Sequence, residues 1–278
     1  PSNVMITFSL VSGGTSVAAL FMAGYIPGIL WGLACMIVIY IFAMKKGYKS
    51  TSSFKGKEKL MVIWQALPSL LMIVIVIGGI IGGIFTATEG SVVAVVYTLI
   101  LSLFFYKTIK FKDLPEIFLA SAEMTGIIVF LIGVSSIMSW VMAFTDIPTL
   151  VSNALLGISN NKYVIFFIIN IILLIVGTFM DMTPATLIFT PIFLPICQQL
   201  GMNVIHFGIM MIFNLCIGTI TPPVGTTLFV GVKVGGTTIE KVIKPLLWYF
   251  AAIFAVLMLV TYVPQISLWL PGVMGYIK

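Results

Sequence analysis

Long apolar runs dominate the sequence and limit what it can fold into. A helix of about 20 apolar residues is enough to cross the hydrocarbon core of a bilayer. The chain is 60% hydrophobic and only 8% charged, whereas a soluble domain has about 25% charged residues. We therefore expect an all-α polytopic membrane protein. Its apolar segments are 3–24, 27–44, 61–85, 89–106, 117–144, 163–180, 184–200, 205–234 and 245–270.

The basic residues of the chain predict its orientation. All 14 of them are lysines, and most lie in the polar connections 45–59, 107–113 and 233–244. Short loops rich in lysine are typical of the cytoplasmic side of a membrane protein, and they offer no basic face for nucleic acid. With this orientation, 163–200 is expected to form a hairpin that enters and leaves on the outer face. The segment 205–234 is then one interrupted crossing.

The ends and the cysteines of the sequence indicate little chemistry of their own. The sequence begins at Pro1 without an initiator methionine and enters apolar sequence within a few residues, so we expect the chain to be a fragment of a longer protein. Cys35, Cys197 and Cys216 lie inside apolar runs, where cysteine behaves as a small hydrophobic residue. Together with the single His206 they predict neither a disulfide nor a metal centre.

Two stretches place prolines and hydroxyl groups within apolar sequence. They are FMDMTPAT (179–186) and GTITPPVGTT (218–227). In each stretch a threonine precedes a proline, which is typical of a helix start, so Thr183 and Thr221 are the expected N-caps. Gly218 is expected to end the helix before the second stretch, so that the crossing is broken near its middle.

A broken helix at membrane depth favours a transport function. Unpaired peptide groups cost several kcal/mol each in hydrocarbon, so a break persists only where protein, water or a ligand pairs with them. Secondary transporters use a hairpin tip and a discontinuous helix to bind a cation and an anion. Asp181 in the first stretch is an intramembrane acid and thus a functional candidate. Simple proline kinking is the alternative interpretation.

Two roles are possible for Glu89, which lies in FTATEGSVV (85–93). Thr88 is expected to cap the following helix, which places Glu89 in the first turn, where the helix dipole favours a negative charge. We prefer this structural role, and a role in binding or coupling is the alternative.

Several motifs, in order, resemble the large membrane subunit of TRAP transporters, the tripartite ATP-independent periplasmic family. The resemblance covers nearly the whole chain and corresponds to the C-terminal two-thirds of such a subunit. It implies the elevator fold of the ion-transporter superfamily, with inverted repeats, a re-entrant helical hairpin and discontinuous helices. The motifs are PSNVMI (1–6), ALFMAGYIPGILWG (19–32), GGIFTATEGSVVAVVY (82–97), FMDMTPATLIFTPIFLPICQQLGMNVIHFGI (179–209), IGTITPPVGTTLFV (217–230) and YVPQISLWLP (262–271).

Inverted repeats imply a division of the chain. Pro1-Ser2-Asn3-Val4 resembles Pro222-Pro223-Val224-Gly225 with the preceding half-helix cut away. The predicted regions are the end of a first repeat (1–60), scaffold and connecting spans of the second repeat (61–162), a transport region with the hairpin and the broken helix (163–234), and a C-terminal span (235–278).

The resemblance also implies the activity and the partners. It implies sodium-coupled uptake of an organic anion across the bacterial inner membrane, with a periplasmic substrate-binding protein that delivers the substrate and a small TRAP membrane subunit beside this chain. Sialic acid is the preferred substrate and a C4-dicarboxylate the alternative. No catalytic residue is expected, because an intramembrane protease needs paired aspartates or a serine with a histidine. A stand-alone sodium-coupled anion carrier or a channel is the alternative function.

The candidate site lies where the hairpin tip is expected to meet the break. One sodium ion is expected there, with Gly177, Asp181, Gly218 and Thr221 as its candidate ligands. Without arginine the chain has no guanidinium clamp, so a substrate carboxylate must rely on helix N-termini and hydroxyl groups. The candidate substrate-binding residues are Ser2, Asn3, Thr183, Thr186, Pro223, Gly225, Thr226 and Thr227.

Overall fold

The computed structural model describes residues 2–47, 56–159, 161–223 and 225–277. These residues form helices, and no strand occurs among them. Within this part of the chain, six helical segments are long and apolar enough to cross a membrane, which confirms the expected all-α polytopic class. They are Val17–Lys46, Leu60–Ile81, Ala87–Phe105, Phe111–Met142, Lys162–Phe179 and Ile239–Tyr262.

The chain folds into two compact units. One unit combines Pro1–Lys46 with Leu131–Lys278, and the other is Gly47–Phe130. The long helix α6 (Leu114–Phe144) contains the boundary at residue 130. Each unit has its own packing, so each is described by itself.

In the smaller unit α5 packs against α4. Two tyrosine hydroxyls bond to α4: Tyr97 of α5 donates to the carbonyl of Pro68 at 2.8 Å, and Tyr106, which follows α5 and η1, donates to that of Gln65 at 3.0 Å. These bonds use phenol groups to pair polar atoms along an otherwise apolar contact. The elements are α4 (Gly56–Ile81), α5 (Ala87–Ile100), the π-helical turn η1 (Leu101–Phe105) and the 3-10 turn η2 (Phe111–Asp113), followed by α6.

The turn between α4 and α5 contains a complete capping box. Thr86 is the N-cap, so the expected cap at Thr88 is wrong. The Thr86 hydroxyl accepts from the Glu89 amide at 3.3 Å, and the Glu89 carboxylate accepts from the Thr86 amide at 2.8 Å. The contacts of Glu89 thus match the structural role that we prefer for it.

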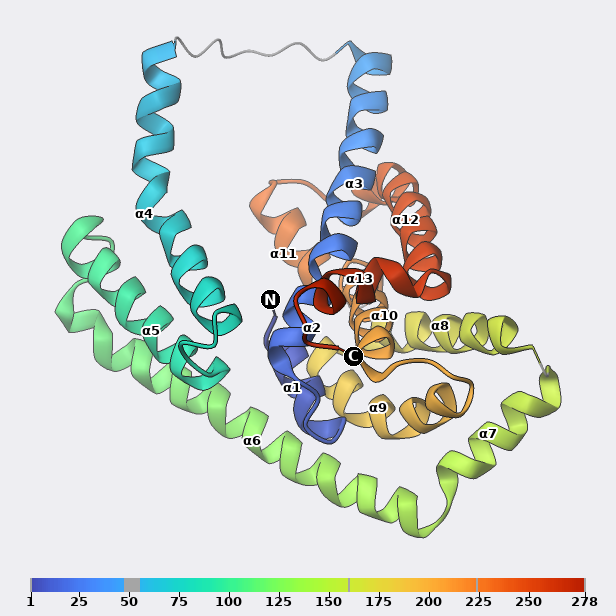
Figure 1. The fold of residues 1–278 in the computed structure, drawn as a ribbon. Coiled ribbons are helices and arrows are strands. Elements are labelled where there is room, and N and C mark those ends of the chain that lie inside the picture. Colours follow the sequence, from blue (N-terminus) through green and yellow to red (C-terminus); the bar gives the residue numbers. More distant parts are fainter. Residues whose placement is uncertain (1, 48–55, 160, 224, 278) are drawn as a thin grey trace. The chain divides into compact units, whose positions relative to one another are not determined.

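The helix α10 (Val204–Gly218) forms the centre of the larger unit. It is mostly apolar and almost completely buried, as expected for a helix surrounded by others. Figure 1 shows it among neighbours from both ends of the chain. These neighbours are α1 (Asn3–Val11), α2 (Val17–Ala23), α8 (Lys162–Phe179), α9 (Met182–Gln199), α12 (Ile239–Tyr262) and α13 (Pro264–Val273). The remaining helices of this unit are α3 (Tyr25–Lys46) and α11 (Thr226–Val234), which both pack on α12, and α7 (Ile147–Ile158), which packs on α9.

Aromatic side chains of α1 and α3 pack against α10. The Phe8 ring of α1 lies over Gly208, where an added Cβ would be only 2.5 Å from a ring carbon. Trp31 of α3 packs against Phe213 with ring centroids 4.8 Å apart. Glycine at position 208 therefore allows α1 to approach α10 closely.

A buried polar network joins α8, α10 and α12. Asn214 donates to the Asn170 side-chain oxygen at 2.8 Å, and Asn170 donates to the Thr261 hydroxyl at 3.1 Å. Asn170 and Asn214 are both 0% exposed, so the network lies in the core of the unit. Interhelical hydrogen bonds of this kind help to fix helix pairs within a membrane.

Several expected apolar segments are divided in the structure. The segment 3–24 forms α1 and α2, because Gly13 and Gly14 have φ values of +84° and +88°, which end the first helix. The segment 245–270 lies in α12 and α13, separated at Val263, because Pro264 disfavours helical geometry at the residue before it. The sequence reading missed α7, whose 12 residues are too few for a full span.

Candidate functional site

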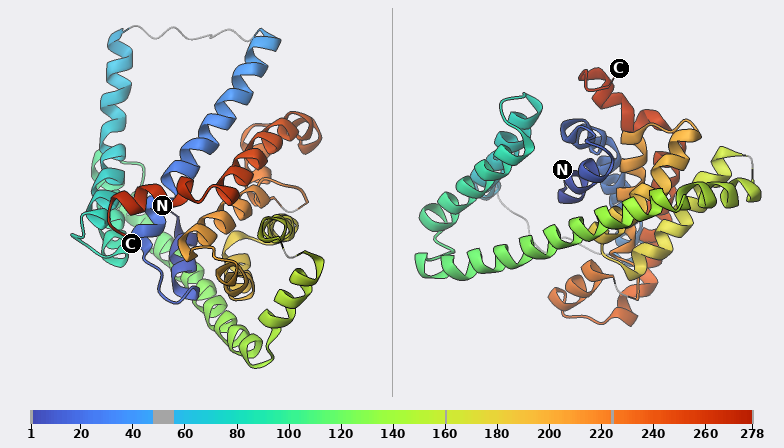
Figure 2. Two further views of the ribbon diagram at one scale, coloured as in Figure 1. Left: turned by 45° about the vertical axis from the view of Figure 1, so that its right-hand side comes forward. Right: turned by 90° about the horizontal axis from the view of Figure 1, so that it is seen from below.

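The hairpin expected at 163–200 is formed by α8 and α9. These helices are separated only by Met180 and Asp181, and they can be followed from yellow to amber in Figures 1 and 2. Asp181 is the N-cap of α9, so the expected cap at Thr183 is wrong. A proline fits anywhere in the first turn, because the amide groups there have no helical partner, so the Thr-Pro pair does not identify the cap. Aspartate is itself among the preferred N-caps.

The carboxylate of Asp181 is available for a ligand. It makes no capping hydrogen bond, and no donor among the described residues lies within hydrogen-bond distance of it. The residue is exposed at the N-terminus of α9, where the positive end of the helix dipole favours an anion.

The crossing expected at 205–234 is broken as predicted, but its caps differ. The helix α10 ends at Gly218, as expected, and α11 begins only at Thr226, with Gly225 as its N-cap. The expected cap at Thr221 is therefore wrong. The Thr221 hydroxyl instead donates back to the carbonyl of Ile217 at 2.7 Å. This bond pairs a carbonyl group in the last turn of α10, so Thr221 belongs to the end of that helix and does not start the next one.

Hydroxyl and amide donors close the C-terminal end of α10. The Thr219 hydroxyl donates to the carbonyl of Cys216 at 2.8 Å, and the Thr221 amide donates to that of Gly218 at 2.9 Å. The Thr227 amide, at the start of α11, donates to the carbonyl of Thr219 at 3.1 Å. The carbonyl groups in the last turn of α10 are therefore paired, whereas no donor in the described part of the chain pairs with those of residues 220–223. The sequence reading missed Thr219, whose signal is a hydroxyl residue within the last turn of a helix.

The end of α8 also leaves carbonyl groups unpaired. Its cap amide, on Met180, donates to the carbonyl of Val176 at 3.0 Å. Among the described residues, no donor pairs with the carbonyl groups of Gly177, Thr178 and Phe179. Free carbonyl groups at a helix C-terminus carry partial negative charge and suit a cation.

The hairpin tip and the end of α10 are in direct contact. A Cβ added at Gly218 would lie 2.5 Å from the carbonyl carbon and oxygen of Gly177, so the two backbones touch. Small residues permit this close crossing of membrane helices. The thiol of Cys216 lies 3.4 Å from the Met182 sulfur, which places the start of α9 at the same end of α10. The structure thus brings Gly177 and Gly218 together.

Among the threonines expected at the tip, Thr186 is the most unusual. It is 0% exposed, and its hydroxyl has no hydrogen-bond partner in the described part of the chain. A buried hydroxyl without a partner costs about 1–3 kcal/mol, which a ligand could offset. Thr183 is half-buried in the first turn of α9.

The predicted residues at the start of the chain lie near α10. Ser2 caps α1, since its hydroxyl accepts from the Val4 amide at 3.3 Å. Ser2 and Cys216 both line a cavity of about 220 Å³ between α1, α3 and α10. This cavity connects the start of α1 with the end of α10 that meets the hairpin tip.

The remaining predicted residues surround the start of α11. Gly225 is buried, and a Cβ there would lie 2.9 Å from the carbonyl oxygen of Thr221. Asn3, Pro223 and Thr227 are exposed, and their side chains make no hydrogen bond to the hairpin tip within the described residues. The Thr226 side chain lies outside the described part of the chain, as does the expected start at Pro1.

Comparison with known proteins assigns the chain to a family. The sequence model of the tripartite ATP-independent periplasmic transporter, DctM component, matches residues 1–266. The chain belongs to this family. The assignment confirms the resemblance to the TRAP large membrane subunit. The family and the six apolar helices of the described chain identify a multi-pass protein of the bacterial inner membrane.

The relatives of the chain are named for different substrates. YgiK of Salmonella typhimurium, an uncharacterized protein, is 54% identical over 98% of this chain. The C4-dicarboxylate TRAP transporter large permease protein DctM of Pseudomonas aeruginosa is 38% identical over 99%, and the sialic acid protein SiaM of Vibrio cholerae is 34% identical over 99%. The chain spans 62% to 65% of the lengths of these three relatives.

Proposed function

We propose that the chain is part of a secondary transporter that takes up a small organic anion. By its family, the transporter would work with a small membrane subunit and with a periplasmic protein that delivers the substrate. The observation that carries this proposal is the contact of the hairpin tip with the broken helix at Gly177 and Gly218. Such a pair of interrupted elements is the arrangement that secondary transporters use for binding.

The substrate class proposed is an anion with a carboxylate or sulfonate group. Relatives named for a C4-dicarboxylate and for isethionate are both 38% identical to this chain, and the one named for sialic acid is 34% identical. Because these values are close, they do not separate the candidates. The preference for sialic acid stays a prediction, and the shared negative charge is the property on which the proposal relies.

The proposed coupling ion is sodium, bound as a co-transported substrate at the hairpin tip. The Asp181 carboxylate and the unpaired carbonyl groups of Gly177 and Phe179 are hard oxygen donors, which suit a small hard cation. The Gly218 carbonyl and the Thr221 hydroxyl each make a hydrogen bond but keep a lone pair. The oxygen set therefore fits sodium without a further ligand type.

The anion is proposed to bind beside this cation. The N-termini of α9 and α11 present amide groups and positive dipole ends, which favour negative charge. The unpaired Thr186 hydroxyl would supply one further polar contact. If the cation holds the tip against α10, then cation and anion each increase the affinity for the other. Elevator movement of this region is what the family resemblance implies, and it stays a prediction.

Transport assays separate this proposal from the alternatives. The complete transporter in proteoliposomes is expected to accumulate a labelled organic acid only when a sodium gradient and its binding protein are both present. Uptake without the binding protein would favour a stand-alone carrier. Uptake that does not depend on the sodium gradient would contradict the proposed coupling. Equilibration of the labelled acid across the membrane without accumulation would indicate a channel.

A further inference from the structure

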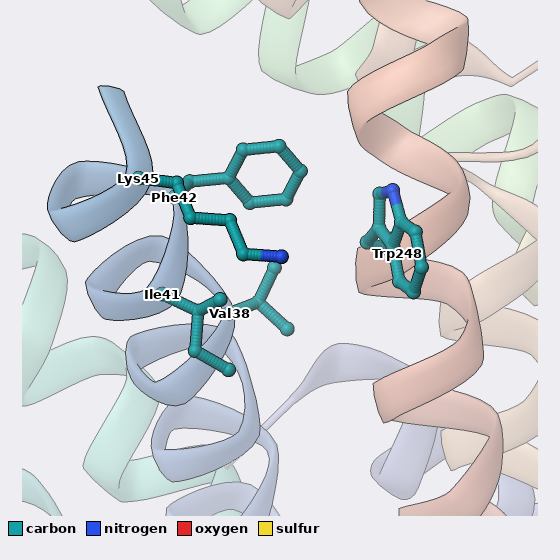
Figure 3. A pocket seen from close by; sticks show the side chains of 5 residues that line it. All are labelled: Val38, Ile41, Phe42, Lys45 and Trp248. Atoms are coloured by element: carbon teal, nitrogen blue, oxygen red, sulfur yellow. The ribbon is translucent and has the colours of Figure 1, made fainter.

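A second cavity lies in the larger unit, between α3 and α12. It has a volume of about 350 Å³ and is lined by Val38, Ile41, Phe42, Lys45 and Trp248. Figure 3 shows the Lys45 side chain extending from α3 toward the Trp248 indole of α12, with Val38 and Ile41 lining the same space. The cavity thus combines apolar walls with one ammonium group. We call it the Lys45 groove.

The ammonium group of Lys45 has no acidic partner in the described chain. No carboxylate there lies within ion-pair distance of its Nζ atom. A lysine that reaches over an apolar surface keeps its methylene stem on that surface and its charge at the polar boundary. The charge of Lys45 is therefore free to bind an anion at the rim of the groove.

Further lysines lie on the two helices that form the groove. Lys241 and Lys244 precede Trp248 by seven and four residues on α12, so all three share one helix face, and both lysines are exposed. Lys46 follows directly on α3, with its Nζ atom 6.0 Å from the Phe42 ring centroid. Glu240 directly precedes Lys241, so the four lysines of these two helix ends outnumber one acidic residue and leave an excess of positive charge beside an apolar surface.

The Trp248 side chain is 64% exposed in this chain. Tryptophan is enriched where membrane hydrocarbon meets the headgroups, because its ring is apolar while its N–H is polar. Lysine and tryptophan together are thus expected at the depth of lipid phosphates.

We propose that the Lys45 groove binds an anionic phospholipid. Its phosphate contacts the Lys45 ammonium, and its acyl chain lies along Val38, Ile41 and Trp248. Basic pockets between membrane helices are known to select acidic headgroups. A free phosphate ion would use the charge but leave the apolar wall unoccupied, so a lipid matches the groove better. The assignment involves neither the hairpin tip nor the transported anion, and it stands independently of the proposed transport function.

Native mass spectrometry of the full permease polypeptide tests this proposal. The protein is purified in detergent and equilibrated with equal amounts of phosphatidylglycerol and phosphatidylethanolamine. Retention of phosphatidylglycerol is expected to dominate, and Lys45→Gln is expected to weaken it about fivefold, the effect of one lysine at an anionic lipid surface. Binding of the zwitterionic lipid should be unchanged by the same substitution.

Lys162→Gln is the matched control, because Lys162 also lies near an aromatic ring, 5.4 Å from the centroid of Tyr163, but outside the groove. It should retain phosphatidylglycerol as the unmodified protein does. An unchanged unfolding temperature in zwitterionic lipid would show that Lys45→Gln is folded. Quenching by brominated phosphatidylglycerol should fall when Trp248 is replaced by phenylalanine.

Three results would overturn the proposal. They are equal loss of lipid in the Lys45→Gln and Lys162→Gln variants, displacement of the lipid by millimolar inorganic phosphate, and quenching that does not depend on Trp248. The second result would indicate a site for small anions. The third would indicate that the groove is covered by another protein segment.

Discussion

The contact between Gly177 and Gly218 can be tested with one methyl group. In Gly218→Ala, the new Cβ would lie 2.5 Å from the carbonyl carbon and oxygen of Gly177 and 2.6 Å from its Cα. All three are backbone atoms, so no side chain can rotate away to make room. The ends of α8 and α10 must move apart.

The expected size of the effect follows from this overlap. Overpacking a close contact costs about 1–3 kcal/mol. Gly177→Ala should cost less, because its Cβ would meet the Cα of Gly218 at 3.2 Å. Gly231→Ala, in α11, is the matched control, since nothing lies within 4 Å of its Cβ. Alanine there should stabilise the helix by up to about 1 kcal/mol.

Thermal unfolding in detergent measures the effect of each substitution on stability, and sodium-dependent uptake measures its effect on cation binding. Stability should decrease in the order Gly231→Ala, Gly177→Ala, Gly218→Ala. If cation binding requires the tip to touch α10, Gly218→Ala should also raise the sodium concentration for half-maximal uptake by about fivefold or more. Equal stability of the three variants would refute the close contact. Full sodium affinity in a clearly destabilised Gly218→Ala protein would refute its role in binding.

Three further substitutions test individual hydrogen bonds. Asn170→Leu should destabilise the protein by about 1–2 kcal/mol in thermal unfolding, because it removes the side chain that links α8 to α10 and α12. An unchanged stability would mean that this network does not contribute to the stability of the fold. Thr221→Val should destabilise the protein by about 1 kcal/mol, because the hydrogen bond of its hydroxyl to the end of α10 is lost. Thr227→Val should leave stability unchanged, since its hydroxyl makes no such bond, and equal effects of the two substitutions would contradict a role of Thr221 at the end of α10. Thr86→Ala removes the capping box and should lower the free energy of unfolding by about 0.5–2 kcal/mol while uptake stays unchanged. Reduced uptake by a protein that is still stable would instead support a coupling role for Glu89.

The break in the second half could be predicted because its signals are local. Gly218 ends a helix and two adjacent prolines cannot continue one, so the interruption follows from sequence alone. The caps could not be predicted in the same way. Asp181 and Thr183 are both good cap residues two positions apart, and Thr221 can bond forward or backward. Tertiary packing selects between these local options.

Long-range contacts were even harder to predict from the sequence. The approach of Gly177 to Gly218 joins two helices across 40 residues, and the unpaired Thr186 hydroxyl appears only when its neighbours are placed. The helix α7 was missed because 12 residues are too few to suggest a span. The expected sides of the lysine connections, the division of the chain into repeat regions and the candidate ligands stay predictions.

The central claim is that a sodium ion binds at the hairpin tip through Asp181. Equilibrium binding of radioactive sodium to the purified transporter tests it most directly, with Asp181→Ala compared with Asp146→Ala. Asp146 is a suitable control because it precedes α7, where its carboxylate accepts from the Thr149 hydroxyl at 2.8 Å. The account predicts that Asp181→Ala weakens sodium binding about tenfold or more, because a charged ligand is lost, while Asp146→Ala binds sodium normally. Equal sodium affinity in the two variants would contradict it.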